Sequence, residues 1–252
     1  MKRRQQSRRG VALMLVLWMI VILGGIAAAV TSSARTTGEV TSNARARSVA
    51  RYAAESGVVA AVAALQQQLE TAGDDEARRR AVLNDAEFAL RDVAEITLGD
   101  AEIRTVMVDA SARIDINAAP EEVLTALLAR AGNAVAAANT ARAIRRHIDS
   151  IPGQAQLLHS LDEAAALEGV DPAQLTRAAG WLTVDGDGQV NRASAAPEVL
   201  GVARGSLVDE PTRIVLVARG WQRGHPLTHE VQAVYAVQGN QLALVRIRER
   251  DL

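Results

Sequence analysis

The chain begins with an apolar stretch, Val11 to Val30, in which 20 successive residues carry no charge. An α-helix of that length rises about 30 Å, which matches the hydrocarbon core of a bilayer. Polar residues appear from Thr31 onward, yet no proline interrupts the chain before Pro120. Residues 39–69 consist mainly of Ala, Arg, Val, Ser, Gln and Leu. The pattern predicts one helix that leaves the membrane and continues to about residue 70.

Residues 71–117 predict a short helix followed by two strands. Residues 71–75, which include Gly73 and two aspartates, end the first helix, and Glu76 to Val93 has the composition of a second helix. Ala101 to Asp109 has a strand-like composition, and Ala112 to Asn117 alternates isoleucine with polar residues. We expect these two strands to form a hairpin.

The rest of the chain changes from a helical to a strand-like pattern. Four short helical segments follow one another at 120–131, 135–148, 161–167 and 172–179, and Asp171 suits the N-cap of the last one. Three strands follow at 212–221, 228–237 and 241–250, with Gly239 and Asn240 as a two-residue hairpin turn. This order predicts an α+β protein with a helical insert before a C-terminal antiparallel sheet.

The charges place the two sides of the apolar stretch in different compartments. The first ten residues contain five basic residues and no acid, so the positive-inside tendency keeps them cytoplasmic and sends the remainder across the membrane. Without these five, 23 basic and 29 acidic residues remain, a net charge of about −6 that disfavours general binding to nucleic acid. The chain has no cysteine, so an exported domain must fold without disulfides.

Three kinds of processing are open for the apolar stretch. A secretory signal would be cut after a small-x-small site, which Ala27 to Ala29 provides, but the apolar core from Val11 is longer than such signals have. A plain anchor would keep every residue. A cut between Gly10 and Val11 would remove only the basic leader and leave the apolar helix on the mature protein.

The segment RRGVALMLVLWMI (residues 8–20) resembles the processing site of type IV pilin-like proteins, in which a short basic leader ends in glycine before an apolar helix. The resemblance implies that a prepilin peptidase cuts between Gly10 and Val11 and that Val11 is then methylated. Most members have glutamate five residues after the cut, where it neutralises the N-terminal amine of the preceding subunit. Here that position is Leu15, and the lack of glutamate is typical of the K-type minor pseudopilin of type II secretion.

Five further segments resemble the same family and extend the resemblance over nearly the whole chain. They are SVARYAAESGVVAAVAAL, RIDINAAPEEVLTALL, LHSLDEAAALEGVDPAQLTRAAGWLTV, GDGQVNRASAAPEVL and LALVRIRERDL. The fourth departs from the family pattern, because Arg192, Ala193 and Ser194 stand where N-x-N-T is usual.

The resemblance implies a pilin-like fold, with a long N-terminal transmembrane helix packed on an antiparallel sheet and an α-helical domain inserted between strands. The expected parts are a leader at 1–10, a transmembrane segment at 11–30, a continued helix at 31–70, a pilin α/β part at 71–117, a helical insert at 118–180 and a C-terminal sheet at 181–252.

The resemblance also implies a structural role in the inner membrane, with a cytoplasmic N-terminus and a periplasmic C-terminal domain. Because Leu15 offers no carboxylate to a preceding subunit, we expect a tip subunit of the periplasmic pseudopilus that helps to nucleate it. Its partners would be the I-type and J-type minor pseudopilins, the major pseudopilin and the prepilin peptidase, with secreted cargo or the outer-membrane secretin as further contacts. A minor pilin of a type IV pilus is an alternative, because the leader chemistry is shared.

A membrane-anchored DNA-binding protein is an alternative of another class, because residues 115–170 also resemble helix-hairpin-helix domains. Those domains hold phosphate with backbone N–H groups at a Gly-x-Gly turn, and the corresponding stretch here has one glycine. Residues 118–180 contain seven acids and five arginines, and Arg142, Arg145 and Arg146 form the one basic cluster. A solvated helix face explains this cluster, so we expect no nucleic-acid partner.

A calcium site is the remaining binding hypothesis, since members of the family bind calcium. Asp185 and Asp187 stand two apart in the glycine-rich stretch VDGDGQVN, where their oxygens would converge on one ion. The spacing begins like an EF-hand, but Gln189 replaces an acid and the twelfth position is Ala196. A plain turn before a strand is the competing interpretation.

No motif indicates catalysis. The sequence contains no G-x-S-x-G, P-loop or H-E-x-x-H motif, and its four histidines are scattered. We therefore do not expect an enzyme.

Overall fold

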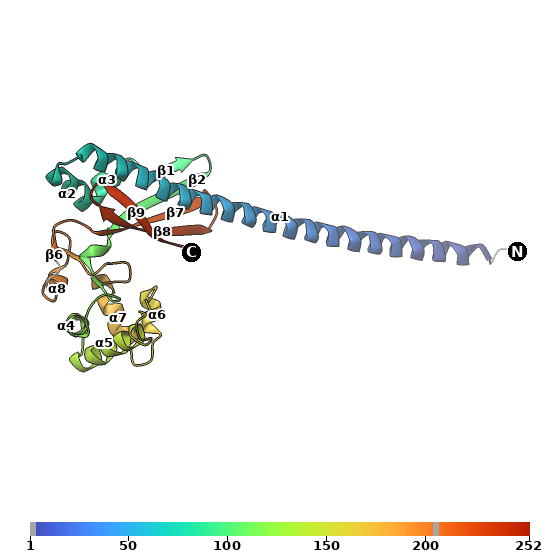
Figure 1. Cartoon of the computed structure of the whole chain (residues 1–252). Coiled ribbons are helices and arrows are strands. Elements are labelled where there is room, and N and C mark those ends of the chain that lie inside the picture. The colour runs from blue at the N-terminus through green and yellow to red at the C-terminus, as the bar shows by residue number, and fades with distance from the viewer. Residues whose placement is uncertain (1–3, 204–206) are drawn as a thin grey trace. The chain divides into compact units, whose positions relative to one another are not determined.

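The computed structural model describes the backbone of residues 4–203 and 207–252, and the side chains of residues 12–203 and 207–252 except that of residue 86. The chain divides into two units, Met1–Ser48 and Val49–Leu252. Helix α1 (Arg4–Ala72) begins in the first unit and ends in the second (Figure 1). The prediction of one continuous helix to about residue 70 is confirmed.

The first unit is a helix that is long and apolar enough to cross a membrane, by length and composition. Polar residues that follow its apolar part satisfy their hydroxyl groups within the helix. Thr31, Thr36, Thr37 and Thr41 each donate to the carbonyl four residues earlier, at 2.8 to 3.1 Å. These hydroxyls therefore need no partner from another element.

The second unit is built on a five-stranded sheet in the order β1-β2-β7-β8-β9, with every neighbouring pair antiparallel (Figure 1). Its strands are β1 (Glu95–Leu98), β2 (Ala101–Asp109), β7 (Arg213–Gln222), β8 (Thr228–Gln238) and β9 (Gln241–Asp251). The three C-terminal strands agree with prediction, and Gly239, with φ of 60°, supplies the left-handed turn between β8 and β9.

The sheet forms one core with the last part of α1. The buried residues of α1 recur every three or four positions, so they share one face of the helix. They pack on strand residues that point to one face of the sheet. The helix contributes Ala54, Val58, Ala61, Leu65 and Leu69, and the strands contribute Met107, Ile214, Leu216, Ala218, Val231, Ala233 and Tyr235.

Two glycines set the distance between α1 and the sheet. A Cβ atom at Gly220 of β7 would lie 2.4 Å from the carbonyl oxygen of Ala50 and 2.4 Å from the backbone nitrogen of Ala54. A Cβ atom at Gly57 of α1 would lie 2.6 Å from the Ile103 side chain. The helix backbone therefore rests directly on the sheet, because both positions lack a side chain.

Asp85 divides the helix expected at 76–93 into α2 (Glu76–Asn84) and α3 (Ala86–Leu90). Its backbone leaves the helical region, at φ −112° and ψ 82°, and its side chain accepts a hydrogen bond from the backbone N–H of Phe88. Asp85 thus ends one helix and caps the next, which is a common role for a short acidic side chain.

The insert contains its own apolar core. Its helices are α4 (Glu121–Ala131), α5 (Ala134–Ile148), α6 (Leu161–Ala165), α7 (Pro172–Ala178) and α8 (Pro197–Leu200), with 3₁₀ turns η1 (Ala110–Ala112) and η2 (Ala179–Trp181). Its short strands are β3 (Ile114–Asp115), β4 (Leu182–Thr183), β5 (Val190–Asn191) and β6 (Leu207–Val208). The core runs from Ile114 to Val202, beyond the 118–180 range expected from sequence.

The expected hairpin between 101–109 and 112–117 is wrong. Strand β2 pairs with β1 on one side and β7 on the other, whereas β3 pairs in parallel with β4. The η1 turn after Asp109 redirects the chain, and the Asp109 carboxylate caps it by accepting the N–H of Ser111 at 2.8 Å. The chain thus leaves the sheet and enters the insert at this point.

We expect Gly220→Ala to destabilise the protein by about 2 kcal/mol, because the new methyl group meets helix backbone that has no room to move. Thermal unfolding of the full chain in detergent measures the change. Gly180→Ala is the control, since a Cβ atom there has nothing within 4 Å. Equal stability of the two variants would contradict the close approach of α1 to β7.

Candidate functional site

The apolar segment of α1 is exposed along its whole described length. Leu15, the position at which glutamate is usual in pilin-like proteins, is 60% exposed. Gly10 and Val11, the predicted cleavage site, fall within the backbone of α1, but their side chains lie outside the described residues. The large apolar residues at 13–23, together with Ile26 and Val30, are each more than half exposed, so this segment is buried only when lipid or other helices cover it.

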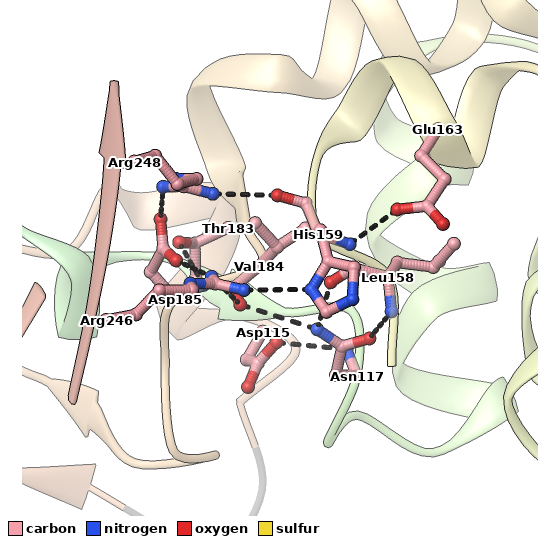
Figure 2. Close-up of polar contacts among 10 residues, drawn as sticks. All are labelled: Asp115, Asn117, Leu158, His159, Glu163, Thr183, Val184, Asp185, Arg246 and Arg248. Carbon is pink, nitrogen blue, oxygen red and sulfur yellow. Dashed lines mark hydrogen bonds and ion pairs between the residues drawn. The ribbon is translucent and has the colours of Figure 1, made fainter. Parts of the chain in front are cut away.

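A polar junction joins the insert to the sheet, and Asp185 is at its centre (Figure 2). Asp185 lies in the loop after β4, its side chain is 9% exposed, and its two oxygens accept from Arg246 and Arg248 of β9. Arg246 also donates to the carbonyl of Val184 at 3.2 Å. Each oxygen of one buried carboxylate therefore holds a different arginine of the edge strand.

Asn117 joins three segments of the insert. Its amide nitrogen donates to the carbonyl of Leu158 at 3.0 Å and to that of Val184 at 3.4 Å, and its amide oxygen accepts the N–H of Leu158 at 2.8 Å. Arg145 of α5 donates to the Asn117 carbonyl at 3.1 Å. The loop before α6 and the loop after β4 are thereby fixed to one side chain (Figure 2).

His159 extends the junction to α6. Its carbonyl accepts from Arg248 at 2.7 Å, its ring Nδ1 lies 3.2 Å from Arg246, and its N–H donates to Glu163 at 2.7 Å. The N–H of Glu163 in turn donates to Ser160, the N-cap of α6, at 3.0 Å. This reciprocal arrangement at the start of α6 is a capping box displaced by one residue, and it orients the loop that holds both arginines.

Asp115 is a buried carboxyl beside the junction. The pKa of Asp115 is raised to about 6, and burial is the largest cause. The N–H of Asn117, which donates to Asp115 at 3.0 Å, opposes the rise, and the charges of Asp185 and Asp187 add to it. Arg246 lowers it. The side chain is packed against Gly186, where a Cβ atom would lie 2.8 Å from the Cβ of Asp115.

The two residues predicted as calcium ligands have different partners. Asp185 holds the arginines of β9, whereas Asp187 accepts from the Thr212 hydroxyl at 3.0 Å and lies 3.8 Å from Arg213. No group of three or more His, Cys, Asp or Glu side chains that suits a metal is found among the residues described. The donor set for one ion is therefore not assembled here, because Asp185 would have to exchange two arginines for it. Calcium binding stays a prediction, which calorimetric titration with calcium chloride checks.

Two of the three arginines in the basic cluster of the DNA-binding alternative form ion pairs within the insert. Arg145 pairs with Asp149 at 2.7 Å, and Arg142 lies 3.5 Å from Glu121. These contacts support the interpretation of a solvated helix face that binds its own acids.

No pattern in the sequence predicts that one cluster contains Asp115, Asn117, His159, Arg246 and Arg248. Their separation along the chain exceeds 130 residues, so no local spacing connects them. One signal was present: an acid between two isoleucines in the strand-like stretch at 112–117, where both isoleucines prove to be buried.

No protein-family model and no curated protein matches the chain. Among solved structures, a chain of the GspK-GspI-GspJ complex from the type 2 secretion system of enterotoxigenic Escherichia coli is similar in fold. The TM-score is 0.58, the identity is 14%, and the match covers 86% of this chain and 99% of that chain. The predicted fold is confirmed: a pilin-like α+β architecture with a long apolar N-terminal helix, an antiparallel sheet and a helical insert.

We expect Asp115→Asn to stabilise the protein at neutral pH. The folded pKa of about 6 lies above the ordinary value of 3.8, so the contribution of Asp115 to stability is fully present below pH 3.8 and is lost as the pH rises through 6. Asparagine keeps the acceptor for Asn117 without a charge, and the gain is on the order of 3 kcal/mol at pH 7. Urea unfolding of the full chain in detergent, from pH 4 to pH 7, measures it.

The control is Asp92→Asn, whose side chain is 88% exposed, so we expect the substitution to change stability little. A gain at Asp115 that is as large at pH 4 as at pH 7 would mean that packing, not charge, causes it.

Proposed function

We propose that the chain is a membrane-anchored minor subunit of a type II secretion pseudopilus. The observation that carries the proposal is the combination of an exposed apolar helix with a pilin-like head that contains a helical insert. The similarity in fold to a chain of the GspK-GspI-GspJ complex supports it. In this role the basic residues before Val11 stay in the cytoplasm and the head lies in the periplasm.

The finer part of the proposal is a position at the tip. A subunit that docks beneath another must neutralise the buried N-terminal amine of that neighbour, because an unpaired charge in an apolar bundle is costly. Leu15 supplies no such carboxylate. A subunit without it is suited to the top of the fibre, where it would nucleate assembly with I-type and J-type subunits above the major pseudopilin and contact cargo or the secretin.

We expect the protein purified from its own membrane to begin at Val11 and to carry an N-terminal methyl group. Intact mass and N-terminal sequencing measure this. Gly10→Leu should keep residues 1–10 attached, because a bulky side chain blocks a peptidase site that needs glycine. Gly24→Leu is the control, since a Cβ atom there meets nothing within 4 Å. An N-terminus at Val30, or an intact Met1, would contradict the pilin-like class.

We expect deletion of the gene to leave exported proteins in the periplasm and to leave pili unchanged. The wild-type chain should restore export, whereas the unprocessed Gly10→Leu chain should not. Loss of pili with normal export would instead favour a minor pilin of a type IV pilus, which shares the leader chemistry.

A further inference from the structure

Strand β9 forms a long, open edge of the main sheet. It runs for 11 residues with β8 on one side, and within the described part of the chain no strand lies on its other side. The opposite edge, β1, has four residues. Proteins usually shorten or cover such edges, because the outward N–H and C=O groups of an edge strand can pair with another chain.

One side of β9 presents apolar side chains next to α1. Arg51 of α1 lies 3.4 Å from Glu249 of β9, and Gln66 donates to the Asn240 carbonyl at 3.0 Å, so helix and strand run beside each other. Leu244 and Ile247 lie between these two contacts.

These apolar residues remain exposed. Leu244 is 54% exposed and Ile247 is 48% exposed, and they stand opposite Tyr235 and Ala233, which belong to the core beneath α1. Val59 of α1 is 67% exposed. An apolar surface thus borders the open edge on the side that faces the helix.

The other side of β9 presents arginines. Arg246, Arg248 and Arg250 alternate along the strand, and Arg219 of β7 lies on the same face. Asp185 is shared by Arg246 and Arg248, and Glu230 by Arg219 and Arg250. Two carboxylates therefore pair with four guanidinium groups, and these six side chains together carry a net charge of +2.

The N–H of Leu242, at the start of β9, donates to the Gln66 side chain of α1 at 3.3 Å. Along the rest of the edge, an occupant has to match three features: outward main-chain groups, an apolar side and a positive side. A helix would cover the apolar side but would not pair with the outward main-chain groups of β9. An extended segment satisfies all three when its side chains alternate, since successive residues of a strand point to opposite faces. Acidic side chains on one face would then lie about 5 Å from the arginines.

We propose that β9 receives, as an added strand, an extended segment of a partner protein in which apolar residues alternate with acidic ones. The apolar residues lie against Leu244, Ile247 and Val59. The acidic residues lie against the outer-face arginines, where they complete the charge that Asp185 and Glu230 leave unbalanced.

The test uses the full chain in detergent and a fluorescein-labelled nine-residue peptide of alternating valine and glutamate. Fluorescence anisotropy should show saturable binding that weakens as salt is added. Two control peptides should bind at least tenfold more weakly. One has lysine in place of glutamate, and the other has two central prolines that remove main-chain donors. Hydrogen exchange should show new protection in β9 and none in β1.

Two matched variants locate the site. Arg250→Gln should weaken binding of the glutamate peptide about threefold, as expected for one exposed ion pair. Arg104→Gln should have no effect, although Arg104 is also an exposed, ion-paired arginine on the outer face.

Three results would overturn the proposal: equal binding of the lysine peptide, protection confined to β1, or no protection at β9. Concentration-dependent dimers in light scattering that lose β9 protection when diluted would show that a second copy, not a partner segment, occupies the edge. None of these outcomes depends on N-terminal processing or on secretion, so the proposed function is tested separately.

Discussion

The direct contact between the backbone of α1 and the sheet is the constraint on which the head depends. It exists because Gly57 and Gly220 have no side chains where helix and strand cross. The buried alanines at 50, 53, 54 and 61 have small side chains, so the neighbouring part of the helix also lies close to the sheet. Small residues bury little apolar area each, so the stabilising area comes from larger residues further along α1, such as Leu65 and Leu69, which α2 and α3 help to cover.

The insert follows a different principle, because it has a separate apolar core and polar groups join it to the sheet. A buried carboxylate contributes little net stability when paired and costs several kcal/mol when its partners are removed. Its main effect is therefore on specificity: Asp185 is satisfied only where two arginines of β9 converge, and Asn117 only where the loops at Leu158 and Val184 meet. Directional hydrogen bonds thus select one placement of the insert that apolar contacts alone would not select.

Periodicity predicted the elements whose stability is local. The long helix, the helices of the insert, the Asp171 cap and the three C-terminal strands follow from apolar spacing and capping residues. The apolar periodicity gave a wrong prediction where pairing with a distant segment determines burial. Ile114 and Ile116 alternate with Asp115 as in a half-exposed strand, but all three are buried, since β3 pairs with a segment almost 70 residues away. The partners of Asp185 lie about 60 residues further along the chain, which no spacing rule reaches.

The parts of the chain that remain uncovered differ in chemistry, and this difference limits what can bind each of them. The apolar segment of α1, residues 11–30, contains no charged residue, so lipid or other apolar helices cover it well, and nothing in it selects a partner by charge. The edge of β9 requires main-chain pairing and acidic side chains, which neither lipid nor an apolar helix provides. Because the two surfaces bind ligands of different chemistry, a ligand of the apolar segment does not compete with a ligand of the β9 edge. A chain with this separation can bind lipid or apolar helices through one surface and an extended acidic segment through the other.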